Sequence, residues 1–98
     1  MDVAAFRKST EGSAPPIADD AALAGLWWAA KGDWAKAHGV VQADESSDAA
    51  WVHAYLHRVE GDLGNAAYWY RRAGQTPAAG ALDQEWGAIA DALLRARQ

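Results

Sequence analysis

The sequence predicts an all-α protein of about five helices, arranged as two helical hairpins followed by one closing helix. Three observations lead to this expectation. Apolar side chains recur at spacings of three and four residues along several segments, which is the period of an amphipathic helix. A Gly-Asp pair interrupts this pattern twice, at residues 32–33 and 61–62, and both pairs belong to an internal repeat. The chain has 98 residues, the size of a single domain.

The repeat is visible when the sequence is shifted by 29 residues against itself. Within residues 21–44, four positions are then identical, and they include the hairpin turn and small residues where two helices would touch. The identical pairs are Ala21 and Ala50, Gly32 and Gly61, Asp33 and Asp62, and Ala37 and Ala66. An internal repeat of this length is typical of stacked helical units.

Residues 1–15 are expected to form a flexible lead-in, because the turn formers at their end show no periodicity. The folded domain is expected to comprise residues 16–98. Its first helix would run over residues 16–31, with acidic side chains near the positive end of the helix dipole. Gly32 can adopt the positive φ that ends a helix, and Asp33 can cap a second helix over residues 34–43.

A polar turn precedes a third helix, which we expect over residues 48–60. The second Gly-Asp pair then ends it, and a fourth helix follows over residues 62–73. Residues 74–80 contain a proline and two glycines and are expected to form a loop. A last helix, over residues 82–96, continues the repeat for half a unit. Such a helix commonly closes the end of a repeat stack.

The second unit carries the most family-like pattern of the chain. Its residues are Gly61-Asp62, Ala66, Trp69-Tyr70-Arg71-Arg72-Ala73 and Pro77; the first unit offers Ala24-Gly25, Trp28, Gly32-Asp33, Ala37 and Val41. In these positions the chain resembles the tetratricopeptide family and the related Sel1-like repeats, over about residues 20–77. The resemblance implies stacked antiparallel hairpins in an α-α superhelix. The units are shorter than the family's usual ~34 residues, and His57 stands where the family has an aromatic residue.

In such a stack, one face of each first helix binds partners. Carried over to this chain, that face includes Leu26 in the first unit and Asp48, Trp51, Tyr55 and Arg58 in the second. Trp51, Tyr55 and Arg58 share one side of a helix by their spacing alone, and these residue types dominate interface energetics. We therefore expect a non-enzymatic interaction module that binds a protein or peptide. The alternative is that the rings pack on the closing helix.

A second hypothesis concerns His53 and His57, which lie one helical turn apart and can chelate a divalent metal or a small ligand. Glu60 extends the same face, and either Glu60 or His38 would supply a third ligand. The zinc-protease pattern requires Glu directly after the first histidine, where this chain has Ala54. The alternative is a packed, hydrogen-bonded histidine pair that binds no metal.

Composition disfavours several other functions. The net charge is −4 and no more than two basic residues are adjacent, so we expect no nucleic-acid partner and no membrane-surface binding. There is no cysteine, no apolar run long enough to span a bilayer, and no hydrophobic leader, so a cytoplasmic location is expected. No nucleophile motif or phosphate loop appears, and we expect neither enzymatic activity nor a cofactor.

Two units leave one stacking face without a neighbour. Either the closing helix covers it or a second copy does, so a homodimer is one of the two expected arrangements.

Overall fold

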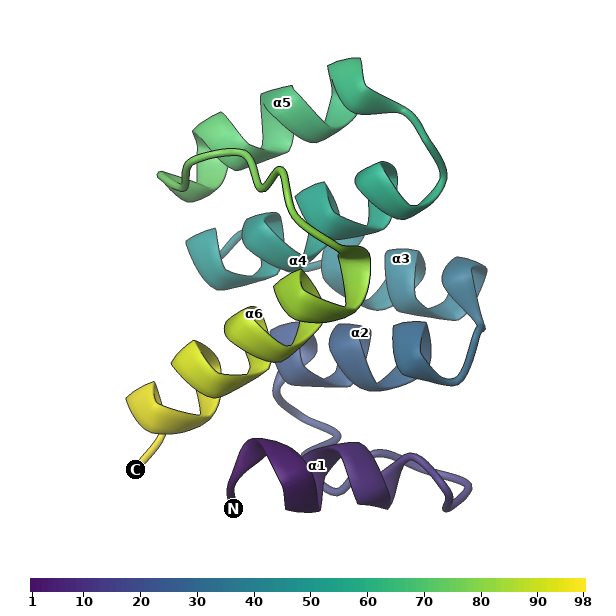
Figure 1. The fold of residues 1–98 in the computed structure, drawn as a ribbon. Helices are drawn as coiled ribbons and strands as arrows, with labels where there is room; N and C mark the ends of the chain where they lie inside the picture. Colours follow the sequence, from purple (N-terminus) through teal and green to yellow (C-terminus); the bar gives the residue numbers. More distant parts are fainter.

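The computed structural model describes all residues 1–98 and contains six helices and no strand (Figure 1). The helices are α1 (Val3–Ser9), α2 (Ala21–Ala30), α3 (Trp34–Gln42), α4 (Ser47–Val59), α5 (Leu63–Ala73) and α6 (Leu82–Ala96). The predicted all-α class is confirmed, but the predicted number of five helices is wrong. None of the six helices has the length and apolar character needed to cross a lipid bilayer.

The additional helix is α1, which lies within residues 1–15, the segment expected to be a flexible lead-in. Phe6 is fully buried and stacks on Trp86, with ring centroids 5.8 Å apart. The indole nitrogen of Trp27 donates a hydrogen bond to Ser9 Oγ at 3.0 Å. A short helix is marginal in isolation and is stabilised by tertiary packing. One buried phenylalanine supplies that packing without producing a periodic pattern in the sequence.

Both Gly-Asp turns have the backbone geometry that the sequence predicts. Gly32 and Gly61 adopt φ values of 82° and 83°, where a side chain would be strained. Asp33 and Asp62 each cap the following helix through a side-chain oxygen. Each Asp amide also donates to the carbonyl five residues earlier, at 3.0 and 2.9 Å. The two halves of the sequence repeat therefore form two equivalent helix–turn–helix corners.

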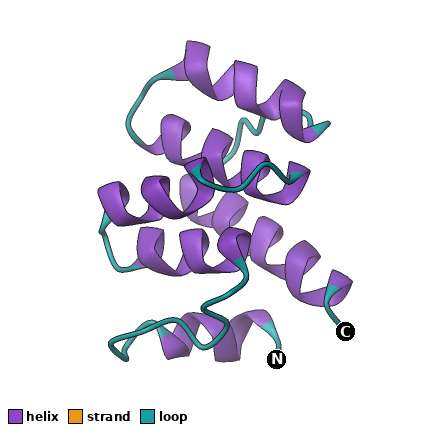
Figure 2. Cartoon of the chain, turned by 180° about the vertical axis from the view of Figure 1, so that it is seen from behind, coloured by secondary structure: helices purple, strands orange, loops and turns teal.

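The helices pack in the order in which they occur, and α6 then returns across the molecule (Figures 1 and 2). α2 packs on α3, α4 packs on both and on α5, and α6 lies against α4, α2 and α1. Close approach is visible at Gly25 in α2, where an added Cβ would lie 2.5 Å from Val41 Cγ1 of α3. Both chain termini lie at the α1 end of the molecule.

The core is centred where α2, α4 and α6 meet. Its fully buried large side chains on these helices are Leu23, Leu26, Trp27, Val52, Leu56, Ile89 and Leu93. By their spacing along the helix, Trp51, Tyr55 and Arg58 lie on one side of α4 and His53, His57 and Glu60 on the opposite side. The two candidate sites lie on these two sides of α4.

Candidate functional site

Of the predicted partner-binding residues, Leu26 and Tyr55 lie in the core of the same chain. Their exposed fractions are 0% and 7%. The indole nitrogen of Trp86, on α6, donates to the backbone carbonyl of Leu26 at 2.8 Å. Burial, followed by the negative charge of Glu85, raises the pKa of Tyr55 to about 12. In this conformation neither side chain offers surface to a partner, because α6 covers them.

Arg58 is occupied by the start of α6 and by the loop before it. Its Nη1 donates to Glu85 Oε1 at 3.0 Å, and its Nη2 donates to the Gly80 carbonyl. The hydroxyl of Tyr70 donates to the second oxygen of Glu85. Burial and this hydrogen bond raise the pKa of Tyr70 above its ordinary value. Glu85 is buried, and the positive charge of Arg58 balances its negative charge. Its two carboxylate oxygens accept from Arg58 and Tyr70.

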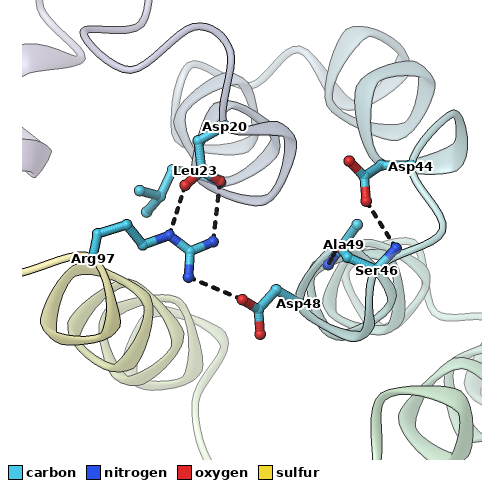
Figure 3. A network of polar contacts seen from close by, with 7 residues as sticks. All are labelled: Asp20, Leu23, Asp44, Ser46, Asp48, Ala49 and Arg97. Atoms are coloured by element: carbon cyan, nitrogen blue, oxygen red, sulfur yellow. Dashed lines mark hydrogen bonds and ion pairs between the residues drawn. The ribbon is translucent and has the colours of Figure 1, made fainter.

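Asp48 is held by Arg97, just beyond the end of α6 (Figure 3). Arg97 Nη1 donates to Asp48 Oδ2 at 2.9 Å, while Nε and Nη2 donate to the two oxygens of Asp20 at 2.7 and 3.3 Å. Asp20 also caps α2 by accepting from the Leu23 amide at 3.1 Å. Burial opposes ionisation of Asp20, but these hydrogen bonds bring its pKa below the ordinary value. Arg97 thus ties the end of α6 to the starts of α2 and α4.

Trp51, the remaining predicted contact, is partly buried between two groups of side chains. It packs against the main core and against a small cluster of Ala54, Ala66 and Tyr70. A hollow of about 390 Å³ opens beside the Arg97 contacts, and its charged lining residues are Asp19, Asp20, Asp44, Asp48 and Arg97. This hollow is acidic and partly neutralised by the arginine.

On the other side of α4 the structure brings three histidines together. His53 and His57 are buried, at 3% and 7% exposure, and His38 of α3 lies partly buried beside them. The ring centroids are 4.6 Å apart for His38 and His53, 5.3 Å for His38 and His57, and 4.9 Å for His53 and His57. Each ring offers a nitrogen within 4.8 Å of the nitrogens of the other two.

Two tryptophans fix the outer rings of this cluster. Trp34 stacks on His38 at 4.7 Å, and its indole nitrogen donates to the Leu56 carbonyl at 2.7 Å. Trp69 of α5 stacks on His53 at 3.8 Å. The imidazoles are therefore held in place by aromatic neighbours from α3 and α5.

The sequence left open whether Glu60 or His38 would complete the histidine pair. The structure places Glu60 Oε1 2.7 Å from His57 Nδ1, where a carboxylate accepts and the ring nitrogen donates. Nε2 of His57 is then its free nitrogen. A second potential metal group, His57, Glu60 and Asp62, would use oxygen atoms that are exposed at the helix end. His38 is the member that joins His53 and His57 in a three-nitrogen cluster.

The cluster favours neutral imidazoles. Burial, followed by repulsion from the neighbouring His38 and His57, lowers the pKa of His53 to about 4. Burial also lowers the pKa of His38, with a contribution from His57 and a smaller opposing one from Glu60. At neutral pH, His38 and His53 therefore carry unprotonated nitrogens that can act as ligands.

The sequence offered the closing helix as one possible cover of the predicted partner surface, but it did not identify the residues that make the contacts, namely Glu85 and Trp86 of α6 and Arg97 just after it. Their helix was expected, and an acid next to a tryptophan is visible at its start, but a helical period does not say which surface a helix covers. Comparisons with models of protein families, with curated proteins and with solved structures find no match to this chain. The functional argument therefore rests on the two sides of α4.

Proposed function

We propose that the protein is a non-enzymatic interaction module, with a tetratricopeptide-like stack that binds an amphipathic helix of a partner protein. One observation carries this proposal. Among the residues predicted to bind a partner, Leu26, Asp48 and Arg58 each form a hydrogen bond or ion pair with α6 or the residue that follows it. The surface of α2 and α4 that holds these residues, here called the α2/α4 surface, thus has the chemistry to bind a helix.

The contacts of α6 specify what kind of helix fits. A carboxylate faces Arg58, and an adjacent indole donates to the Leu26 carbonyl. An arginine about three helical turns later reaches two carboxylates. The apolar side of α6 contributes Ile89 and Leu93 to the core. A partner helix would carry the same order: an acid and tryptophan near its start, an apolar stripe, and a basic residue at its end.

The covalent connection gives α6 an advantage over any such partner. The loop of residues 74–81 joins α6 to α5, and a short flexible linker produces an effective concentration of the order of millimolar. A free helix at micromolar concentration therefore binds the α2/α4 surface only if its affinity exceeds that of α6, or if the docking of α6 is weakened. We therefore expect partner binding to compete with the docking of α6.

A peptide of residues 81–98, labelled with fluorescein, tests this expectation by fluorescence anisotropy on the full-length protein. Arg97→Ala removes the ion pairs that hold α6, so this variant should bind the peptide more tightly than the wild type. A peptide with Trp86→Ala is the matched control and should bind neither protein. Equal failure of the unmodified peptide on both proteins would refute a helix-binding α2/α4 surface.

The same surface provides a route to the predicted homodimer. A second copy can contribute its own α6, since exchange of an identical element keeps every contact. Sedimentation equilibrium of the Arg97→Ala variant would reveal such a dimer as a concentration-dependent increase in mass. A monomer at all concentrations would leave a different protein as the partner.

A further inference from the structure

The three histidines on the other side of α4 have an arrangement that packing alone does not require. Aromatic stacking would be served equally well by phenylalanine or tyrosine, whereas imidazole adds nitrogens that have to be hydrated or bonded. His57 satisfies one nitrogen through Glu60, but His38 and His53 form no side-chain hydrogen bond within the protein. The cluster therefore holds ring nitrogens without a protein partner, and its three potential ligand atoms lie within 4.8 Å of one another.

These nitrogens are accessible as well as unpaired. Every side-chain nitrogen or oxygen that is sealed from solvent has a hydrogen-bond partner in this structure. The unpaired nitrogens of His38 and His53 are therefore within reach of solvent, although His53 is only 3% exposed. This solvent contact is the side from which an ion and a fourth ligand such as water would approach.

We propose that His38, His53 and His57 bind one divalent transition-metal ion, of which Zn²⁺ is the reference case. A tetrahedral zinc site has Zn–N bonds of about 2.0–2.1 Å, so its nitrogens lie about 3.3 Å apart. The three nitrogens already lie within 4.8 Å of one another. On binding the ion, the ligand nitrogens must therefore approach one another by up to about 1.5 Å.

Glu60 acts in this site as a positioning residue. Metal-bound histidines commonly donate their second nitrogen to a carboxylate, which fixes the tautomer and orients the ring. The 2.7 Å contact from His57 Nδ1 to Glu60 Oε1 has this form and directs Nε2 to the metal. Its negative charge also offsets part of the charge of an ion that is bound by three neutral ligands.

The ligand set selects the class of metal. Imidazole nitrogen suits Zn²⁺, Cu²⁺, Ni²⁺ and Co²⁺, whereas Mg²⁺ and Ca²⁺ prefer oxygen. Trp34 and Trp69, which stack on His38 and His53, place indoles directly against the bound ion's ligands. The site is separated by α4 from the α2/α4 surface, so metal binding and helix binding can be tested independently.

The test is a calorimetric titration of zinc sulfate into the full-length chain, without a histidine tag and after removal of metal by chelator. We expect saturable binding of one ion per chain. His38→Phe keeps a ring stacked on Trp34 but removes one ligand, and it should weaken binding by more than about 100-fold, the upper end of the loss expected for an outer ligand. Glu60→Gln keeps an acceptor oxygen for His57 and should weaken binding less, within the ~10–100-fold range of outer ligands.

A matched control separates this site from the acidic hollow at the start of α4. Asp44→Asn removes a carboxylate from that hollow and should leave the zinc affinity unchanged. Loss of binding in Asp44→Asn, or unchanged affinity in His38→Phe, would overturn the three-histidine site. Circular dichroism checks that each variant is folded, and His38→Gln replaces His38→Phe if the latter is not.

Cobalt provides a readout that a purely structural cluster would not give. Co²⁺ bound by three nitrogens and water in a tetrahedral site absorbs visible light much more strongly than six-coordinate Co²⁺ on an exposed carboxylate. We expect the strong spectrum with the wild type and its loss with His38→Phe. A weak six-coordinate spectrum with the wild type would contradict the proposed geometry.

Discussion

The two sides of α4 differ in whether their polar side chains are bonded within the protein. On the side that faces α6, both charged residues predicted to bind a partner are bonded: Arg58 donates to Glu85, and Asp48 accepts from Arg97. Towards α3 and α5, His38 and His53 leave ring nitrogens without a partner. Polar groups bonded within the protein hold the structure together, whereas ring nitrogens that have no protein partner and are open to solvent can take a ligand. One helix therefore combines a structural interface with a candidate binding site.

The largest expected loss of stability comes from removing a buried side chain of α6. Trp86 is buried, stacks on Phe6 and donates to the Leu26 carbonyl. Trp86→Ala should lower the free energy of unfolding by about 3–5 kcal/mol, because it leaves a large cavity. Urea denaturation followed by circular dichroism measures the change. Trp69→Ala on the histidine side is the control, since Trp69 is only partly buried; an equal loss there would refute the contrast.

A second prediction compares two glycines in neighbouring helices. Gly25→Ala would place a methyl group 2.5 Å from Val41 Cγ1 and should lower the free energy of unfolding by about 1–3 kcal/mol. Gly39→Ala meets no atom within 4 Å and should raise it by about 0.5–1 kcal/mol through better helix propensity. Thermal melts of both variants provide the comparison. If the two shifts had the same sign, the close packing of α2 on α3 would be wrong.

Acid should affect the two sides in different pH ranges. The pKa of His53 is about 4 in the folded protein, against 6.5 for the free side chain. Between these values the unfolded chain binds the extra proton, so stability should fall as the pH drops from about 6.5 to 4. The pKa of Asp20 is lowered from 3.8, so its contribution should be lost only at still lower pH.

Free energies of unfolding measured from pH 7 to pH 3 should therefore decline in two steps. His53→Gln removes the titrating ring, and it should flatten the upper step while leaving the lower one. An upper step that persists unchanged in this variant would show that the burial of His53 does not govern it.

The smallest effect concerns the end of α6. Arg97→Ala removes the ion pairs to Asp20 and Asp48 and should cost about 1 kcal/mol. Arg95→Ala on the same helix loses only an exposed pair with Asp91 and should cost less. High salt should reduce the difference between the two, because it screens partly exposed charges. Equal melting temperatures at low salt would contradict the role given to Arg97.

Local chemistry made much of the fold predictable. Both Gly-Asp turns and their capping aspartates follow from the sequence, because glycine and aspartate act through their nearest neighbours. The bounds of α6 follow from its apolar period. α1 was missed because its stability comes from Phe6 packing on a residue far along the chain. Whether a partner or the closing helix covers the predicted surface was left open for a related reason: a helical period defines an apolar side but not its partner.

The candidate sites show the same limit. The spacing of His53 and His57 predicted that they share a side of α4, and the structure confirms this. His38 was one of two options for a third member, and only the packing of α3 on α4 places it in the cluster. Of the predicted partner-binding residues, Leu26, Asp48 and Arg58 contact α6 or the residue after it, which is the alternative that the sequence left open.

The most direct test of the contrast between the two sides is a ¹H–¹⁵N spectrum of the tryptophan indoles during zinc titration. The chain has six tryptophans, and their indole signals report on both sides of α4. One equivalent of zinc should shift the signals of Trp34 and Trp69, which stack on the histidines, and leave that of Trp86 in place. Shifts at Trp86, or none at Trp34 and Trp69, would contradict the account.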